Sequence, residues 1–153
     1  MVKINNKVWL HEFQLTNGEL LALSQVVKKY AVLYFYPRAN TPGCTTESQN
    51  FSTEYQAFKG LGCEVLGVSM DSLKKQQNFK SKYEMPFELA ADVDEVLCQE
   101  FDVIKEKNMY GKKFMGIERS TFIINSAGEV LQSWCKVKVP GHVHEVLSAV
   151  KEL

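Results

Sequence analysis

The chain has 153 residues, 45% of them hydrophobic, and its 18 basic residues balance its 18 acidic ones; this length can bury the core of one domain, spanning residues 1–153, without disulfides or a structural metal. The basic residues are scattered, which excludes the electrostatic footprint of a nucleic-acid-binding protein. Because no apolar run approaches the roughly 20 residues of a membrane span and the N-terminus lacks the pattern of a secretory signal, we expect a cytoplasmic protein with no membrane partner.

The first predicted elements are a hairpin, a short helix and a buried strand. Asn17-Gly18 suits the positive backbone dihedrals of a tight turn, so it separates two short β-rich runs. The continuous apolar run that follows is typical of a central strand covered on both faces, and Pro37 ends it. The predicted ranges are strands over 9–15, 20–23 and 31–36 and a helix over 24–29.

The next part of the chain alternates helices with strands. Aromatic residues at helical spacing predict an amphipathic helix over 45–59, which Gly60 and Gly62 end. Beyond it, the patterns predict a strand over 64–69, a helix over 72–83 that begins at Asp71 or Ser72, and a short strand over 86–90. Strands joined in this way by helices form parallel βαβ units, and the carboxyl ends of such strands usually line the functional site.

The last third of the chain predicts a short helix through Phe101, capped by Asp92 or Asp94, and then a loop over 104–116, where the residues are polar, basic and poorly periodic. Strands over 121–125 and 130–137 flank a Ser-Ala-Gly turn, and a helix covers 143–153. A βαβ half followed by a ββα half is the outline of a thioredoxin-like α/β fold. We therefore expect a central mixed β-sheet flanked by helices, with the N-terminal β-hairpin as an extension.

Cys44 is the first candidate for chemistry, because it lies where a buried strand gives way to a helix. The unpaired N–H groups and partial positive charge of a first helical turn favour an anion, and therefore the nucleophilic thiolate form of a cysteine. Cys63, Cys98 and Cys135 lack this context and fit the commoner role of a small hydrophobic residue.

The loop before Cys44 predicts a compact polar pocket. Thr41 lies three residues before the thiol, a spacing that can fold its hydroxyl over the sulfur, and Gly43 lets the backbone approach a small ligand closely. Pro37 and Pro42 restrict the loop and hold the pocket in place. Backbone N–H groups and the Thr41 hydroxyl can then stabilise negative charge on an attacked oxygen.

A positive charge would complete this pocket. Arg119 is the predicted source, because it immediately precedes a strand in the half of the chain that must pack beside the first half. Arg38 is nearer in sequence and is the rival. Glu47 falls on the first turn of the helix, where it can either orient an arginine or complement the helix dipole.

The histidines and tryptophans give no sign of a cofactor site. His142 and His144 have no carboxylate or thiol at metal spacing, so we expect solvent contact or capping near the last helix and no metal ligation. Trp9 and Trp134 lie in strand patterns and are expected to pack against the core.

The pattern Pro37-x-x-x-Thr41-x-x-Cys44 resembles the active-site motif of the peroxiredoxins. The longer run from Phe35 to Glu47 resembles their Q-type branch, also called bacterioferritin comigratory protein. The resemblance extends through residues 65–72, 85–87, 116–124 and 136–143 and so covers nearly the whole chain. Within it, Arg119 matches the active-site arginine of the family.

The resemblance implies a thiol-dependent peroxidase. In that reaction Cys44 attacks the terminal oxygen of hydrogen peroxide or an organic hydroperoxide, releases water or an alcohol and becomes a sulfenic acid. Thr41, the loop backbone and Arg119 would orient the peroxide, and the other residues expected around the substrate are Pro37, Pro42, Gly43 and Glu47. The resemblance implies no metal, flavin or nucleotide; it implies thioredoxin, glutaredoxin or a small thiol as reductant, and a monomer.

The chain departs from the Q-type pattern at Gln49. Many members of that branch carry their resolving cysteine at this position, five residues after the peroxidatic one, so the familiar disulfide within the helix cannot form here. Either an outside thiol reduces the sulfenic acid, as in one-cysteine peroxiredoxins, or a distant cysteine resolves it after local unfolding. Cys98 is the favoured internal candidate, because it lies on a short predicted helix beside a loop.

Two other functions fit a reactive thiol in this fold. A thioredoxin-like disulfide reductase is disfavoured, because that chemistry normally uses two neighbouring thiols and no Cys-x-x-Cys pair is present. A non-enzymatic redox sensor or holdase would use Cys44 only as a switch. Catalytic consumption of peroxide with a thiol reductant separates a peroxidase from both.

Overall fold

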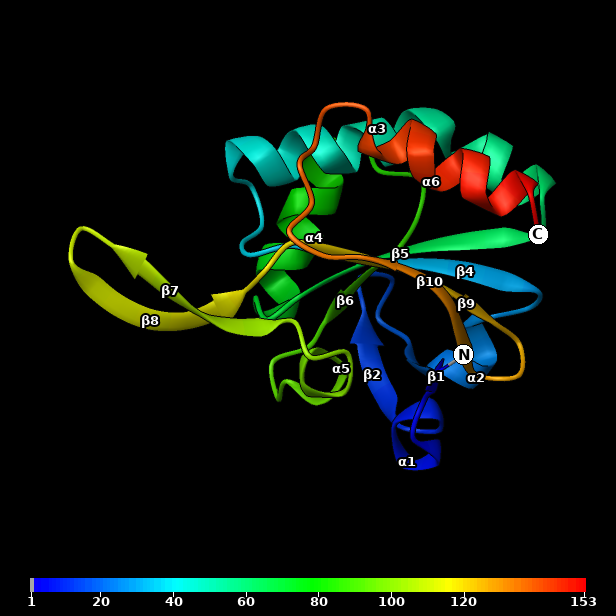
Figure 1. Cartoon of the computed structure of the whole chain (residues 1–153), viewed down its shortest axis with the longest axis horizontal. Coiled ribbons are helices and arrows are strands. Elements are labelled where there is room, and N and C mark those ends of the chain that lie inside the picture. The colour runs from blue at the N-terminus through cyan, green and yellow to red at the C-terminus, as the bar shows by residue number, and fades with distance from the viewer. Residues whose placement is uncertain (1) are drawn as a thin grey trace.

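The computed structural model describes residues 2–153 and contains an eight-stranded mixed sheet with helices against both faces (Figure 1). The strand order is β1-β10-β9-β4-β5-β6-β2-β3, in which β4, β5 and β6 are parallel and the other neighbours are antiparallel. The strands of this sheet are β1 (Val2–Lys3), β2 (Glu12–Leu15), β3 (Leu20–Ala22), β4 (Tyr30–Phe35), β5 (Cys63–Ser69), β6 (Leu89–Ala91), β9 (Ser120–Asn125) and β10 (Glu129–Trp134). The predicted mixed sheet with an N-terminal hairpin is confirmed.

Alternate side chains of the central strand β4 enter two separate cores, because successive residues of a strand point to opposite faces of the sheet. Leu33 and Phe35 pack with α1, α2 and α5, whereas Tyr34 and Tyr36 pack beneath α3, α4 and α6. The helices are α1 (Asn6–Trp9), α2 (Leu23–Val26), α3 (Pro42–Gly60), α4 (Leu73–Lys82), α5 (Val96–Glu100) and α6 (His142–Lys151). None of them is both long and apolar enough to cross a bilayer.

Helix α3 begins three residues earlier than the apolar pattern predicts. Pro42 occupies its first turn. N–H groups there have no partner within the helix, so the missing N–H of proline costs no hydrogen bond, and its fixed φ suits a helix. The buried residues recur at helical spacing along one face and are Cys44, Glu47, Ser48, Phe51 and Phe58. The early start brings Cys44 into the first turn of the helix, with its side chain toward the sheet.

The antiparallel pairing of β9 with β4 sets where the second half of the chain meets the first. Phe35 at the end of β4 pairs with Ser120 at the start of β9, and Tyr34 pairs with Thr121. The residue before β9 therefore lies at the carboxyl end of β4, where α3 begins. That residue is Arg119.

The segment 104–116 is a hairpin, so the predicted loop is wrong. Strands β7 (Ile104–Met109) and β8 (Lys112–Ile117) form a separate antiparallel ribbon that projects from the body of the molecule (Figure 1). Tyr110 and Gly111 both have positive φ, at 54° and 78°, as a two-residue hairpin turn of the I′ type requires. Most side chains of this β7–β8 arm are exposed, so the sequence carries no alternation of buried and exposed residues to reveal its strands.

Smaller differences concern the ends of elements. Trp9 closes α1 and is not in a strand, because Asn5 caps a helical turn before the hairpin. The strand expected over 86–90 is β6, three residues later at its start, and β10 ends at Trp134 and not at residue 137. Asp92 is the residue that satisfies the first turn of α5, since its carboxylate accepts from the N–H groups of Leu97 and Cys98.

His142 is buried, so the expectation of solvent contact is wrong for this residue. Its Nε2 lies 2.7 Å from the Thr121 hydroxyl, and its ring meets Trp134 edge to face with the ring centres 5.8 Å apart. Burial lowers the pKa of His142 to about 4. The neutral ring therefore joins the start of α6 to β9.

We expect Gly67→Ala to destabilise the fold, because the new Cβ would stand 2.7 Å from Leu89 and 2.8 Å from the Tyr34 ring. Overpacking of this kind costs about 1–3 kcal/mol. Urea unfolding should show that loss. Gly60→Ala is the matched control, because a Cβ at that position would point into open space, with no neighbouring side chain within 4 Å; equal stability of the two variants would contradict the packing described.

Candidate active site

A cavity of about 560 Å³ opens beside the first turn of α3. Its wall combines the loop after β4, the start of α3, the end of β5 and the β7–β8 arm. The lining residues are Pro37, Arg38, Thr41, Cys44, Met70, Lys107, Met109, Phe114, Met115, Gly116, Ile117 and Arg119. The structure thus brings four of the predicted site residues, Pro37, Thr41, Cys44 and Arg119, to one cavity.

Cys44, Arg119 and Glu47 form a chain of contacts at the base of this cavity. Arg119 Nη2 donates to Cys44 Sγ at 3.3 Å, and Nη1 donates to Glu47 Oε1 at 2.7 Å. The thiol is only 1% exposed. One guanidinium therefore bridges the thiol and a buried carboxylate, which is the orienting role for Glu47 that the sequence left open.

Gly43 makes this approach possible. A Cβ at this position would stand 3.1 Å from Arg119 Nη2, closer than side-chain atoms normally tolerate. The glycine expected to admit a small ligand therefore admits the guanidinium itself. Pro42, beside it in the first turn, takes its place in the helix and does not line the cavity.

Thr41 occupies the position before the helix and lines the cavity, and the hydrogen bond of its hydroxyl is to the backbone of the loop. Oγ1 donates to the carbonyl oxygen of Arg38 at 2.9 Å, and the Thr41 carbonyl accepts from the N–H of Thr45 at 2.8 Å. Arg38 also lines the cavity, yet the guanidinium in contact with Cys44 is that of Arg119.

Residues that the sequence did not single out hold the loop from 37 to 41 in place. The Asp71 carboxylate accepts from the N–H of Ala39 and from the Ser69 hydroxyl, both at 2.7 Å. Tyr83 donates to the side-chain oxygen of Asn40 at 3.0 Å, where the backbone has a positive φ of 61°. Asp71 is the second residue after β5, a strand that was predicted to within one residue, so its position was the available signal.

The electrostatics of Glu47 are set by its burial. The side chain is 0% exposed, and Oε2 has no hydrogen-bond partner among residues 2–153. Burial raises the pKa of Glu47 to about 7, against the opposing pull of Arg119. Burial also works against the charge of Arg119, but Glu47 and Cys44 outweigh it and raise the pKa of the guanidinium.

The other three thiols lie away from the cavity. Cys98 is fully buried in the core on the opposite face of the sheet, and burial, followed by the nearby Asp92, raises its pKa. Burial raises the pKa of Cys63 to about 12. Cys63 lies beyond the end of α3 at Gly60, and by the rise of the helix Gly60 is about 24 Å from Cys44. Cys135 is exposed and follows β10 at the end where β10 meets the start of β9.

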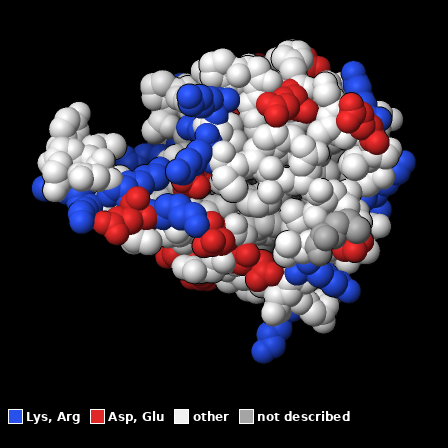
Figure 2. Space-filling model, viewed as in Figure 1, with Lys and Arg blue, Asp and Glu red and all other residues white. Residues whose placement is uncertain are grey.

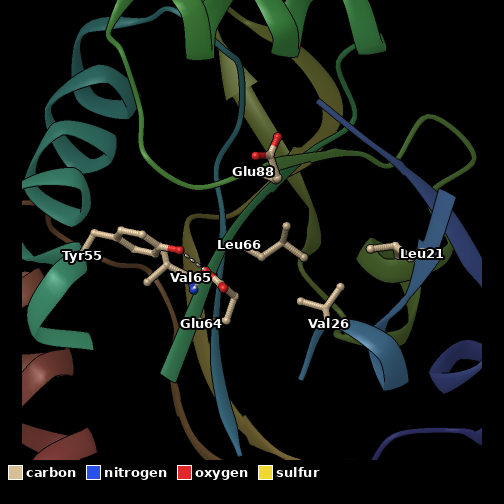
Figure 3. A pocket seen from close by; sticks show the side chains of 7 residues that line it. All are labelled: Leu21, Val26, Tyr55, Glu64, Val65, Leu66 and Glu88. Atoms are coloured by element: carbon tan, nitrogen blue, oxygen red, sulfur yellow. Dashed lines mark hydrogen bonds between the residues drawn. The ribbon is translucent and has the colours of Figure 1, made fainter. Parts of the chain in front are cut away.

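A second cavity, of about 210 Å³, lies over β5 and contains none of the predicted site residues (Figure 3). Tyr55 donates to Glu64 at 2.8 Å within it, and its remaining lining is Leu21, Val26, Val65, Leu66 and Glu88. Its lining contains no cysteine, lysine or arginine, unlike that of the cavity at Cys44.

Comparisons with known proteins agree with the geometry. Residues 5–133 match the model of the AhpC/TSA family. Peroxiredoxin Bcp of Xanthomonas campestris pv. campestris is 50% identical over 137 residues, which cover 90% of this chain and 86% of that protein. Peroxiredoxin Bcp of Bacillus subtilis is 43% identical over 152 residues, which cover 99% and 97% of the two chains.

A solved structure of the bacterioferritin comigratory protein of Xanthomonas campestris superimposes with a TM-score of 0.94 at 44% identity. The match covers 99% of this chain and 97% of that one, and that structure concerns alkyl peroxide reduction by the Xanthomonas protein.

We expect Glu47→Gln to change how stability depends on pH. Because the pKa of Glu47 is raised to about 7 on folding, the native state holds its proton to higher pH than the unfolded state does. As the pH rises from 5 to 8, the free energy of unfolding of the wild type should therefore fall by about 1–3 kcal/mol relative to that of Glu47→Gln. Urea unfolding of both proteins at the two pH values measures this; a difference that is constant with pH would contradict it.

Proposed function

The chain belongs to the AhpC/TSA family and is a thiol-dependent peroxidase of the peroxiredoxin Bcp group, and on this premise we propose that Cys44 is the thiol that attacks the peroxide. The observation that carries the proposal is the 3.3 Å contact between Cys44 Sγ and Arg119 Nη2 at the base of an open cavity. Nucleophile and fixed positive charge meet there in the first turn of a helix, which favours the thiolate.

The reaction follows from this arrangement. The Cys44 thiolate attacks the terminal peroxide oxygen; the new sulfur–oxygen bond forms as the oxygen–oxygen bond breaks, and the leaving oxygen departs with the electron pair and takes a proton from solvent. Negative charge moves from sulfur to the leaving oxygen. The Arg119 guanidinium carries five N–H donors in one rigid plane, so it can donate to both the sulfur and the leaving oxygen while its Nη1 is held by Glu47.

The loop supports the substrate. Pro37 and Thr41 line the cavity, and Thr41 is fixed by its bond to the Arg38 carbonyl, which leaves the hydroxyl oxygen free to accept from a peroxide O–H. Pro42 and Gly43 act indirectly, one by starting the helix and the other by admitting Arg119.

The size and lining of the cavity support organic hydroperoxides as substrates together with hydrogen peroxide. Hydrogen peroxide would occupy a small part of about 560 Å³, and the wall contributed by Met70 and the β7–β8 arm is largely apolar. The arm supplies Met109, Phe114 and Met115 to that wall.

We propose that an external thiol reduces the sulfenic acid, as the one-cysteine alternative requires. Cysteines whose Cα atoms are more than about 7 Å apart cannot form a disulfide without backbone movement. Cys98, the favoured internal candidate from the sequence, would have to leave the core on the other face of the sheet to reach Cys44. Cys135 is the more accessible internal alternative, because it is exposed and lies toward the Arg119 end of β9.

Thioredoxin, glutaredoxin or a small thiol fits the reductant on this proposal, since each supplies the thiolate that displaces the sulfenic oxygen. We propose a monomer working in the cytoplasm, a reducing compartment in which the four free thiols would persist.

Cys44→Ser should abolish peroxide consumption with dithiothreitol as reductant, because serine supplies no thiolate. Arg119→Met should lower kcat/KM by about 10²–10³, the usual cost of losing one preorganised donor to a developing oxyanion. Arg38 lines the same cavity but does not contact the sulfur, so Arg38→Met should lower kcat/KM less than Arg119→Met does. Retained turnover in Cys44→Ser would overturn the assignment.

One equivalent of hydrogen peroxide should add one oxygen to Cys44 without forming a disulfide. Intact-mass spectrometry with peptide mapping measures this in wild type, Cys98→Ser and Cys135→Ser proteins. A loss of two mass units that Cys98→Ser or Cys135→Ser removes would instead identify that residue as an internal resolving cysteine.

A further inference from the structure

Lys107 lies at the middle of β7, directly opposite Phe114 of β8, and its side chain lines the same cavity as Cys44 and Arg119. Basic side chains gather along the β7–β8 arm and continue onto the body of the molecule (Figure 2). Most of the arm is exposed, but Lys107 is partly buried. It is the lysine of the arm that lines the cavity at Cys44.

The stem of Lys107 is held by packing. It crosses Gly116, where a Cβ would stand 3.4 Å from Lys107 Cδ and 3.7 Å from its Cε. The absence of a side chain at this position lets the stem lie flat against β8, which limits where the ammonium group can go.

Lys107 also differs from its neighbours in its ion pairing, although Glu118 acts on its charge from a greater distance than an ion pair. Its neighbours on the arm are engaged, since Lys105 pairs with Asp102 at 3.1 Å and Lys113 pairs with Glu106 at 3.7 Å. Lys107 itself forms no ion pair with any residue from 2 to 153. Its charge is therefore available to the contents of the cavity.

We propose that Lys107 is a second cation of the active site, which stabilises the Cys44 thiolate and the negative charge that develops on the leaving oxygen. The inference rests on the proposed role of Cys44. The net charge of the reacting atoms stays at minus one from thiolate attack until the released hydroxide or alkoxide takes a proton from solvent. A cation that faces the cavity therefore acts on the charge at both ends of its path.

The charges around Lys107 are consistent with this role. Partial burial and then Arg119 lower the pKa of Lys107, while Cys44 and Glu118 act in the opposite direction. The groups that face the cavity are Cys44 from α3, Arg38 from the loop after β4, and Arg119 from the connection between β8 and β9. Cys44 is thus the nucleophile among two arginines and one lysine.

Lys107→Met tests the proposal, because it keeps much of the stem and removes the charge. The pH midpoint for alkylation of Cys44 by iodoacetamide should rise by about 0.5–1 unit, at the lower limit of the shifts that a nearby opposite charge produces. The kcat/KM for hydrogen peroxide should fall about 10-fold, less than for Arg119→Met, because Lys107 has no hydrogen bond to the sulfur. Lys107→Arg restores the charge and should recover most of both quantities.

Lys112→Met is the matched control. It removes the same charge from the same arm, but Lys112 lies at the exposed tip and does not line the cavity. Its alkylation midpoint and kcat/KM should equal those of the wild type. Circular dichroism and thermal unfolding verify that each variant is folded.

The proposal would be overturned if Lys107→Met matched the wild type in both the alkylation midpoint and kcat/KM. It would also be overturned if Lys107→Met and Lys112→Met lost equal amounts, because the effect would then come from the overall charge of the arm. The proposed role of Cys44 is tested separately: if Cys44→Ser retains turnover, Cys44 is not the nucleophile, whatever Lys107→Met does.

Discussion

The antiparallel pairing of β9 with β4 is the constraint on which the active site depends. It places the residue before β9 at the carboxyl end of β4, so that Arg119 reaches a thiol 75 positions earlier in the chain. The two strands are central to the sheet and buried on both faces. The position of the guanidinium is therefore determined by the most deeply buried part of the thioredoxin-like fold and does not rely on the movement of a loop.

The same arrangement places a carboxylate in an unfavourable, buried environment. Glu47 is buried with one oxygen unpartnered, which is unfavourable for a carboxylate, yet it fixes the edge of Arg119 that faces away from the sulfur. A buried hydrogen bond between Tyr34 and Ser48, 2.9 Å long, ties the same turn of α3 to β4. The site thus combines an unfavourable buried charge with a helix that is firmly attached to the sheet, and the fold tolerates the first because of the second.

The β7–β8 arm has the opposite character. It forms its own two-stranded ribbon, adds few side chains to either core and keeps most of its surface in solvent. Substitutions in the arm would therefore alter the cavity with little effect on the sheet, as is usual for functional segments carried on a rigid scaffold. The nucleophile and its arginine come from the scaffold, whereas much of the wall that a substrate meets comes from the arm.

The local pattern of apolar and turn-forming residues determined many of the secondary-structure elements and the position of the candidate nucleophile. The apolar run of β4, the Asn-Gly hairpin and the proline-flanked junction at Cys44 each follow from side chains close in sequence, because hydrophobic periodicity and turn chemistry act over a few residues. Tertiary structure decided the rest: the arm had no buried face to reveal its strands, Thr41 turned to the Arg38 carbonyl, and Cys98 entered the core opposite Cys44. Asp71 reaches the loop after β4 only because β4 and β5 pair, and Lys107 shares a cavity with Cys44 only because the arm lies beside the start of α3. Such long-range contacts are not written in the spacing of neighbouring residues.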